Sequence, residues 1–96
     1  MIQSFADKTT ADIFQDRNTK DARRIPNALW RVAQRKLKML DVAVRVNDLE
    51  SPPGNRFEAL KGQMRGRYGI RVNEQYRVTF RWEDGHAFEV AVEDYH

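Results

Sequence analysis

The sequence predicts an α+β fold in which two N-terminal helices pack on a mostly antiparallel sheet. In the first half of the chain, one segment has apolar residues every three or four positions, as on one face of a helix. After residue 55 the apolar residues alternate with polar ones, as in half-buried strands. Only a few residues join these alternating segments, and such short connections require antiparallel neighbours. Helices followed by a strand meander indicate a helix layer on one face of a sheet.

Two helices are expected before residue 50. A short one should span residues 8–15, with Asp7 in position to cap its first turn. The main helix should begin near Pro26, because proline suits the first helical position. Its expected apolar face consists of Ile25, Leu29, Ala33, Leu37, Leu40 and Val44. Its other face fits either a solvated surface or a contact for an acidic partner or an RNA backbone. That face carries Arg31, Gln34, Arg35 and Lys38.

The strands are separated by clear breaks. Pro52, Pro53 and Gly54 end the helical half, since neither helix nor strand continues through them. The Asp84-Gly85 pair is typical of a hairpin turn. A short opening strand is expected at the N-terminus, and four more follow the proline break. The expected strands span residues 2–5, 56–61, 68–72, 76–82 and 87–95.

Strand alternation predicts one apolar and one polar face of the sheet. The apolar face should contain Tyr68, Ile70, Val72, Tyr76, Val78, Phe80, Trp82, Phe88, Val90 and Val92. The polar face should contain Gly69, Arg71, Arg77, Thr79, Arg81, Glu89 and Glu93. Its arginines can pair with the glutamates across strands, or they can form a phosphate-binding surface. The two interpretations are compatible if Arg81 pairs with acids while Arg71 and Arg77 stay free.

Composition narrows the class of protein. A chain of 96 residues can bury one core, so residues 1–96 are expected to form a single domain. The chain has no cysteine, no signal-peptide pattern and no apolar run of membrane-spanning length, so we expect a cytoplasmic protein with no membrane association. The formal net charge is +3, but residues 56–81 carry seven cationic and two anionic side chains, a local excess of five. Such a concentration of positive charge suggests a nucleic-acid partner.

The residue types exclude several chemistries and leave one open. The only histidines, His86 and His96, have no metal-ligand spacing, so no metal or other cofactor is expected. RNA can be cleaved without a metal if a base deprotonates the ribose 2′-hydroxyl, cations stabilise the phosphorane, and an acid protonates the departing 5′-oxygen. Asp94 or His96 could transfer the protons. Lys61 and Arg77 could supply the charge, and Tyr95 could stack on a base.

The whole chain resembles the HigB branch of the RelE toxin superfamily, through many short motifs in a fixed order. In the first half these are Phe5-Ala6-Asp7 with Thr10, Lys36-Leu37, Asp48-Leu49 and Pro52-Pro53-Gly54-Asn55-Arg56. In the second half they are Leu60-Lys61-Gly62, Gly66, Ile70-Arg71-Val72-Asn73, Gln75 with Arg77, Phe80-Arg81-Trp82 and the closing Asp94-Tyr95-His96. No single motif is diagnostic, whereas their order over nearly the full length is.

The resemblance implies a RelE-like fold and a toxin of a type II toxin–antitoxin module. Such a toxin is a ribosome-dependent endoribonuclease that cleaves mRNA in the A site and so inhibits translation and growth. The implied partners are the ribosome, mRNA and a HigA-type helix-turn-helix antitoxin, through which the pair would reach operator DNA. By position, the catalytic residues would be Lys61, Arg77, Asp94, Tyr95 and His96. The candidate RNA-binding residues are Arg71 and Asn73, which lie in a family motif, together with Arg56, Arg65 and Arg67 of the positively charged segment.

Two features complicate this interpretation. Some relatives have a histidine three residues before the lysine, where this chain has Glu58, which carries the same sign of charge as phosphate. A regular last strand would also send Asp94 and His96 to the apolar side, so a catalytic role requires either that pairing ends near Glu93 or that the site lies at the rim of the sheet. Two alternatives remain open: a ParE-like inhibitor of DNA gyrase, and a non-enzymatic corepressor that acts with its antitoxin.

Overall fold

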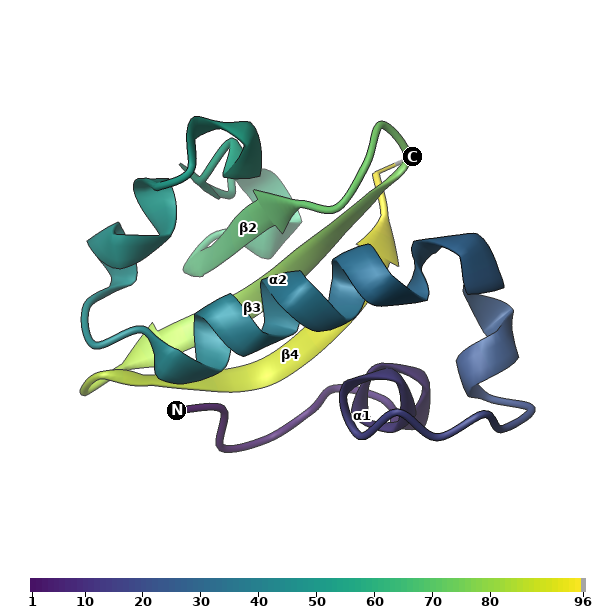
Figure 1. Ribbon diagram of the computed structural model, residues 1–96. Helices are drawn as coiled ribbons and strands as arrows, with labels where there is room; N and C mark the ends of the chain where they lie inside the picture. Colours follow the sequence, from purple (N-terminus) through teal and green to yellow (C-terminus); the bar gives the residue numbers. More distant parts are fainter. Residues whose placement is uncertain (96) are drawn as a thin grey trace.

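The computed structural model describes residues 1–95 as a helix layer on one face of a four-stranded antiparallel sheet (Figure 1). The strands follow one another in the order β1-β2-β3-β4, so each neighbours the next in sequence. The helices are α1 (Lys8–Phe14) and α2 (Trp30–Val42). The strands are β1 (Glu58–Ala59), β2 (Arg67–Arg71), β3 (Tyr76–Glu83) and β4 (His86–Asp94). The predicted α+β architecture is therefore confirmed, with strand pairing antiparallel throughout these four strands.

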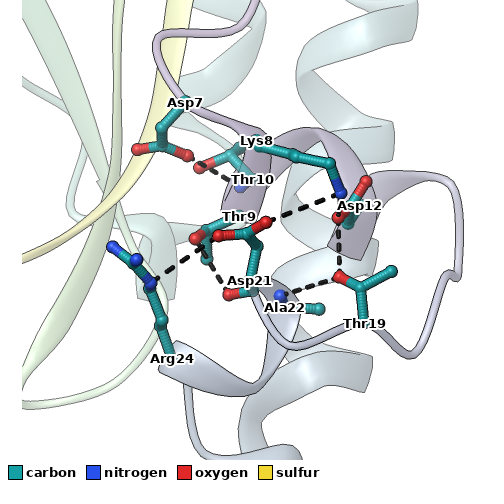
Figure 2. Close-up of polar contacts among 9 residues, drawn as sticks. All are labelled: Asp7, Lys8, Thr9, Thr10, Asp12, Thr19, Asp21, Ala22 and Arg24. Carbon is teal, nitrogen blue, oxygen red and sulfur yellow. Dashed lines mark hydrogen bonds and ion pairs between the residues drawn. The ribbon is translucent and has the colours of Figure 1, made fainter.

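Helix α1 begins where the sequence predicted and is held by a buried acid (Figure 2). The Asp7 carboxylate accepts a hydrogen bond from the Thr10 backbone amide at 2.7 Å, which confirms the predicted cap. One turn later, Asp12 is 2% exposed and accepts hydrogen bonds from Lys8 Nζ at 2.5 Å and Thr19 Oγ1 at 2.6 Å. The Thr19 hydroxyl in turn accepts from the Ala22 amide at 3.1 Å. This network ties α1 to the chain that leads towards α2.

Helix α2 is the element that covers the sheet. A 3₁₀ turn, Asn27–Leu29, follows Pro26, so the α-helix itself starts later than expected, at Trp30. Its inner face buries Ala33, Leu37 and Leu40 completely. In Figure 1 the helix runs across β3 and β4. No helix within residues 1–95 is both long and apolar enough to span a bilayer.

The C-terminal end of α2 corrects one expected core position. Val44 was predicted on the apolar face but is 75% exposed. The helix ends at Val42, and Ala43 is already extended, so the side chains after it no longer follow the helical stripe. Ala43, 8% exposed, supplies the last buried side chain of this segment.

A β-bulge between β3 and β4 overturns a second assignment. Thr79 pairs with Ala91 but Arg81 pairs with Phe88, so two residues of β4 stand opposite one of β3. The extra residue is Glu89, whose φ of 52° lies in the left-handed region. Because the bulge reverses the alternation, Phe88 joins the polar face instead of the predicted apolar one. The Arg81 guanidinium lies 4.8 Å from the centre of its ring.

The N-terminal segment extends the sheet at the outer edge of β4. The predicted opening strand is present as two parallel bridges, Ile2 with Ala87 and Phe5 with Val90. Backbone hydrogen bonds from Gln3 to Ala87 at 2.8 Å and from Val90 to Ser4 at 3.0 Å cover this edge. The core lies between this extended sheet and the two helices. Its fully buried side chains include Ile13, Leu37, Leu40, Leu49, Ile70, Val78, Phe80 and Val90.

Candidate functional site

Arg77, the second residue of β3, lies on the polar face near one end of the sheet. The register places it between Arg71 on β2 and Glu93 on β4. Its side chain is only 20% exposed, and one guanidinium nitrogen is 3.8 Å from a carboxylate oxygen of Glu58. The guanidinium carbon lies 5.0 Å from the centre of the Tyr95 ring. The Nε atom is buried and has no hydrogen-bond partner in residues 1–95, so the guanidinium is held in place while its donors are not all used.

Gly69 lies beneath the aliphatic part of the Arg77 side chain. Gly69 on β2 pairs with Glu58 on β1 and with Thr79 on β3. A Cβ atom at Gly69 would lie 3.6 Å from Cδ of Arg77 and 3.4 Å from a methyl carbon of Leu60. These are ordinary van der Waals distances, so the aliphatic part of Arg77 passes over β2 at Gly69 on its way towards β1.

Two grooves meet at Glu58. The first has a volume of about 440 Å³ and the second about 310 Å³. The first groove is lined by Arg56, Glu58, Arg71, Asn73, Glu74 and Tyr95. The second is lined by Glu58, Ala59, Leu60, Lys61, Met64 and Arg77. A polyanion could therefore place one phosphate near Arg77 and continue into the groove on either side.

The last residues of β4 bring one predicted catalytic residue to this site and leave another at its edge. Pairing continues to Asp94, one residue beyond Glu93, and the Tyr95 amide still donates to the Gln75 carbonyl at 2.7 Å. Tyr95 reaches the polar face and the first groove, as alternation predicted. The exposed Asp94 carboxylate accepts from the Gln75 side-chain amide at 3.0 Å and lines neither groove. His96 lies outside the described residues. Pairing therefore does not end near Glu93, so a catalytic role for Asp94 would require a site that extends to the rim of the sheet.

The predicted RNA-binding residues divide into two groups. Arg56 and Arg71 line the first groove, as does Asn73, whose side-chain oxygen also accepts from the Gln75 and Tyr76 amides and so shapes the β2–β3 turn. Arg65 and Arg67 line neither groove. Arg65 is exposed and follows a 3₁₀ turn.

Arg67 and Arg81 stabilise the bulged part of the sheet. An Arg67 guanidinium nitrogen donates to the Glu89 carbonyl at 2.6 Å, across the bulge. Arg81 forms ion pairs with Glu83 at 2.5 Å and Glu89 at 3.5 Å. Glu93 instead accepts from the Thr79 hydroxyl at 2.5 Å. The combined interpretation of the arginines therefore holds for Arg81, which is paired with acids. It is wrong for Arg77, which was expected to stay free but forms an ion pair with Glu58.

Glu58 is the site residue whose position the sequence reasoning did not anticipate. Its charge made it look like a departure from the RNA-cleaving pattern, but it lies between the grooves and beside Arg77. The useful signal was its spacing of three residues before Lys61 on a short strand. The chemistry available here is a carboxylate among several cations and an aromatic ring. Within residues 1–95 no three carboxylate, imidazole or thiol groups gather to hold a metal.

Two solved structures that share this fold are YoeB–YefM complexes. A YoeB–YefM complex from Staphylococcus aureus matches with a TM-score of 0.61 over 100% of this chain and 98% of the other, at 18% identity. A heterotetrameric YoeB–YefM toxin–antitoxin complex from the same organism gives the same values. At this identity the match shows the fold alone, which is that of the RelE-like toxins.

Sequence comparisons give the family. The model of the RelE-like HigB toxins of type II toxin–antitoxin systems matches residues 3–96. Toxin HigB-1 of Vibrio cholerae serotype O1 is 45% identical over 85 residues, which are 88% of this chain and 87% of that protein. An uncharacterized protein of Haemophilus influenzae is 43% identical over 61 residues, 64% of this chain and 60% of its own length. The chain therefore belongs to the HigB family of RelE-like toxins.

Proposed function

We propose that this toxin is a ribosome-dependent endoribonuclease that cleaves mRNA in the A site without a metal. The observation that carries the proposal is the position of the Arg77 guanidinium, between the Glu58 carboxylate and the Tyr95 ring, where the two grooves meet. A scissile phosphate beside Arg77 would place the nucleotide on one side in the first groove and its neighbour in the second.

The proposed reaction is an in-line attack by the ribose 2′-oxygen. Glu58 takes the 2′-hydroxyl proton, the 2′-oxygen bonds to phosphorus, and the bond from phosphorus to the 5′-oxygen breaks. Arg77 and Lys61 stabilise the negative charge that develops on the phosphorane oxygens. The 5′-oxygen leaves with a proton from His96, the residue that follows Tyr95, or from Asp94. The products are a 2′,3′-cyclic phosphate and a 5′-hydroxyl.

The other site residues hold the substrate. The Tyr95 ring packs on Arg77 and also lines the first groove. In that groove the ring can stack on a nucleobase. Arg56, Arg71 and the side-chain amide of Asn73 provide donors for phosphate and sugar oxygens in that groove. Arg65 and Arg67 would reach RNA only beyond the two grooves. The ribosome would supply the remaining alignment of the mRNA, since positioning can contribute more to such a reaction than acid–base catalysis does.

The proposed partners follow from the family and the fold. The family belongs to toxin–antitoxin systems, and the solved YoeB–YefM structures are complexes of toxin and antitoxin. We therefore propose a HigA-type helix-turn-helix antitoxin, through which the pair would bind operator DNA. Because the proposed cleavage takes place on the ribosome, the toxin would act in the cytoplasm. Residues 1–96 would form one domain.

The test compares Arg77→Ala with Arg81→Ala, two arginines on the polar face of the same strand. Removal of Arg77 should lower the cleavage rate of ribosome-bound mRNA by about 10²- to 10³-fold, the range seen when one charge-stabilising donor is lost. Arg81→Ala should stay within a few-fold of wild type, because Arg81 is paired with acids outside both grooves. The measurement is mapping of mRNA 5′ ends with purified ribosomes and after brief induction.

Two results would contradict the proposal. In the first, wild-type protein leaves ribosome-bound mRNA intact while Arg77→Ala is as toxic as wild type. In the second, the toxin blocks DNA supercoiling and Arg77→Ala blocks it equally, which would instead indicate gyrase as the target.

A further inference from the structure

Lys36 is a buried cation on a helix face that is otherwise apolar. It lies on the inner side of α2 with Ala33 and Leu37, and it is 7% exposed. Its Nζ atom donates to Oδ1 of Asn55 at 2.5 Å, and within residues 1–95 no carboxylate forms an ion pair with it. Burial, and then the neighbouring Arg35, lower the pKa of Lys36. A cation without a counter-charge is unfavourable in such a place, so packing alone does not explain it.

Asn55 connects Lys36 to the segment between α2 and β1. Its side chain is fully buried, and the amide nitrogen donates to the carbonyl oxygens of Leu49 at 3.1 Å and Ser51 at 3.3 Å. In Figure 1 this segment, in teal, leads from the end of α2 towards the β2 side of the sheet. Lys36 and Asn55 belong to two of the short motifs of the sequence, 19 residues apart. One side-chain amide therefore ties the whole segment to the middle of α2.

Arg56, the next residue, leaves this segment in a strained backbone conformation. Its φ of 45° and ψ of 48° lie in the left-handed region, which residues other than glycine rarely adopt. Such a conformation persists only where the surrounding contacts hold it. The Arg56 amide donates to the Pro53 carbonyl at 3.1 Å, and the Asn55 amide donates to the Pro52 carbonyl at 2.9 Å. The buried Asn55 side chain fixes this turn against α2, and with it the direction in which Arg56 enters the first groove.

Glu58 depends on the same anchor because β1 is short. The strand has two residues and lies at the edge of the sheet, beside β2. Glu58 follows Asn55 by three residues, a length of at most about 11 Å of extended chain. Between them, Phe57 stacks on Tyr68 with the ring centres 5.5 Å apart. A displacement of Asn55 would therefore be passed on to the carboxylate that lies beside Arg77.

We propose that Lys36 is a positioning residue of the site: its hydrogen bond to Asn55 holds Arg56 and Glu58 at the first groove. Lys36 lies in the helix layer and touches no substrate, so it acts only through this connection. The inference rests on the proposed function for the parts that Arg56 and Glu58 play in cleavage. It explains why a cation without a counter-charge occupies a buried position that an apolar side chain could fill.

The first test measures single-turnover cleavage of ribosome-bound mRNA by Lys36→Met. This change removes the donor and keeps the length of the side chain. The loss of a desolvated charge should offset the loss of the hydrogen bond, so the Tm should change little. Cleavage should nevertheless slow by about tenfold or more, because a small misplacement of the reacting groups has a large effect on rate. Lys36→Arg, which keeps the charge and the donors, should recover most of the rate. Lys38→Met, at an exposed position of the same helix, is the control and should match wild type.

A double-mutant cycle distinguishes positioning from a general loss of folded protein. In Glu58→Gln the carboxylate that Lys36 positions is already absent. Adding Lys36→Met there should lower the cleavage rate by a much smaller factor than it does in wild type. A loss of folded protein would instead lower the rate by the same factor in both backgrounds.

Amide hydrogen exchange gives a measurement that needs no RNA. The Arg56 amide donates to Pro53, and the Leu60 amide donates to the Arg67 carbonyl at 2.8 Å, on either side of β1. In Lys36→Met the protection of both amides should fall by about tenfold or more, while the amides of α2 and β3 exchange as in wild type. If Lys36→Met does not fold, Lys36→Gln, whose side chain is one bond shorter than lysine, should give the same pattern.

Three results would overturn the proposal. They are cleavage by the variant at the rate of an active wild type, an equal decrease in rate in both backgrounds of the cycle, and unchanged exchange at Arg56 and Leu60. A failure of the proposed function looks different. Wild-type toxin would then leave ribosome-bound mRNA intact, while the Arg56 amide would still lose protection in Lys36→Met.

Discussion

At the scale of single residues, the site depends on how Arg77 is held. Its guanidinium touches a carboxylate on one side and an aromatic ring on another, and its aliphatic part crosses Gly69. These three contacts come from β1, β2 and the end of β4, so the position of one arginine reports the pairing of the whole sheet. The same contacts restrict the side chain before any substrate arrives, which is what electrostatic stabilisation of a transition state requires.

Glu58→Gln tests the proposed general base. The amide keeps the size of the carboxylate but cannot accept a proton, so single-turnover cleavage of ribosome-bound mRNA should fall by about 10²- to 10⁴-fold. Glu74→Gln is the control, because Glu74 lines the first groove without contacting Arg77. A Glu58→Gln rate equal to wild type would transfer the role of base to Asp94 or His96.

Substitutions of Tyr95 distinguish ring contacts from hydroxyl chemistry. Tyr95→Phe keeps the surface that packs on Arg77 and should retain most of the cleavage activity. Tyr95→Ala removes that surface and the stacking platform, worth about 1–3 kcal/mol per base, so the KM for mRNA should rise about tenfold or more. Equal losses in the two variants would show that the hydroxyl, and not the ring, is needed.

At the scale of elements, α1 is short and depends on tertiary contacts for its place. It has seven residues, fewer than an isolated helix needs in water. The buried Asp12 links Lys8 within the helix to Thr19 in the following connection, while the Thr9 hydroxyl donates to the Asp21 carbonyl at 2.9 Å (Figure 2). Thr10 accepts from the Val92 amide at 2.9 Å, so the same helix also holds the end of β4 near the site.

The Asp12 network predicts a loss of stability in acid. The hydrogen bonds from Lys8 and Thr19 hold the pKa of Asp12 below its ordinary value. A carboxylate with a lowered pKa in the folded state stabilises the protein above its unfolded pKa of about 4, and that contribution is lost as the pH falls through the lowered value. Asp12→Asn should therefore lower the Tm at pH 7. At pH 2, where wild type has lost this contribution, the Tm values of the two proteins should lie closer together.

The measurement is thermal unfolding of both proteins from pH 7 to pH 2. Asp48, whose pKa is lowered by the Arg45 and Val44 backbone amides, contributes in the same direction in both proteins, so the difference between the two Tm curves isolates Asp12. A Tm difference that stays constant over this range would contradict a role for the Asp12 charge.

At the scale of the whole molecule, the fold separates stability from chemistry. The helices pack on one face of the sheet, and the proposed site lies on the other face and at the rim.

Leu37→Ala, at a fully buried position on α2, should cost about 2–5 kcal/mol of unfolding free energy. Urea denaturation measures this loss. The cleavage rate per folded molecule should match that of wild type. A large decrease in this rate would mean that α2 shapes the grooves directly.

Local patterns were enough to predict the main elements and the fold class. The Asp7 cap, the buried face of α2 and the antiparallel meander follow from side-chain spacing and turn residues, which act over a few residues of chain. The ordered motifs also led to the correct family. These features were predictable because each is encoded within one short segment.

The sequence by itself therefore determined the elements, their order and the family, whereas the tertiary structure decided which side chains meet. The bulge at Glu89 moved Phe88 to the polar face, and the pairing of β1 brought Glu58 to Arg77. Arg67, expected to bind RNA, holds the bulge through the Glu89 carbonyl. The physical reason is shared: these contacts join different strands, and strand register together with the bulge determines which groups meet.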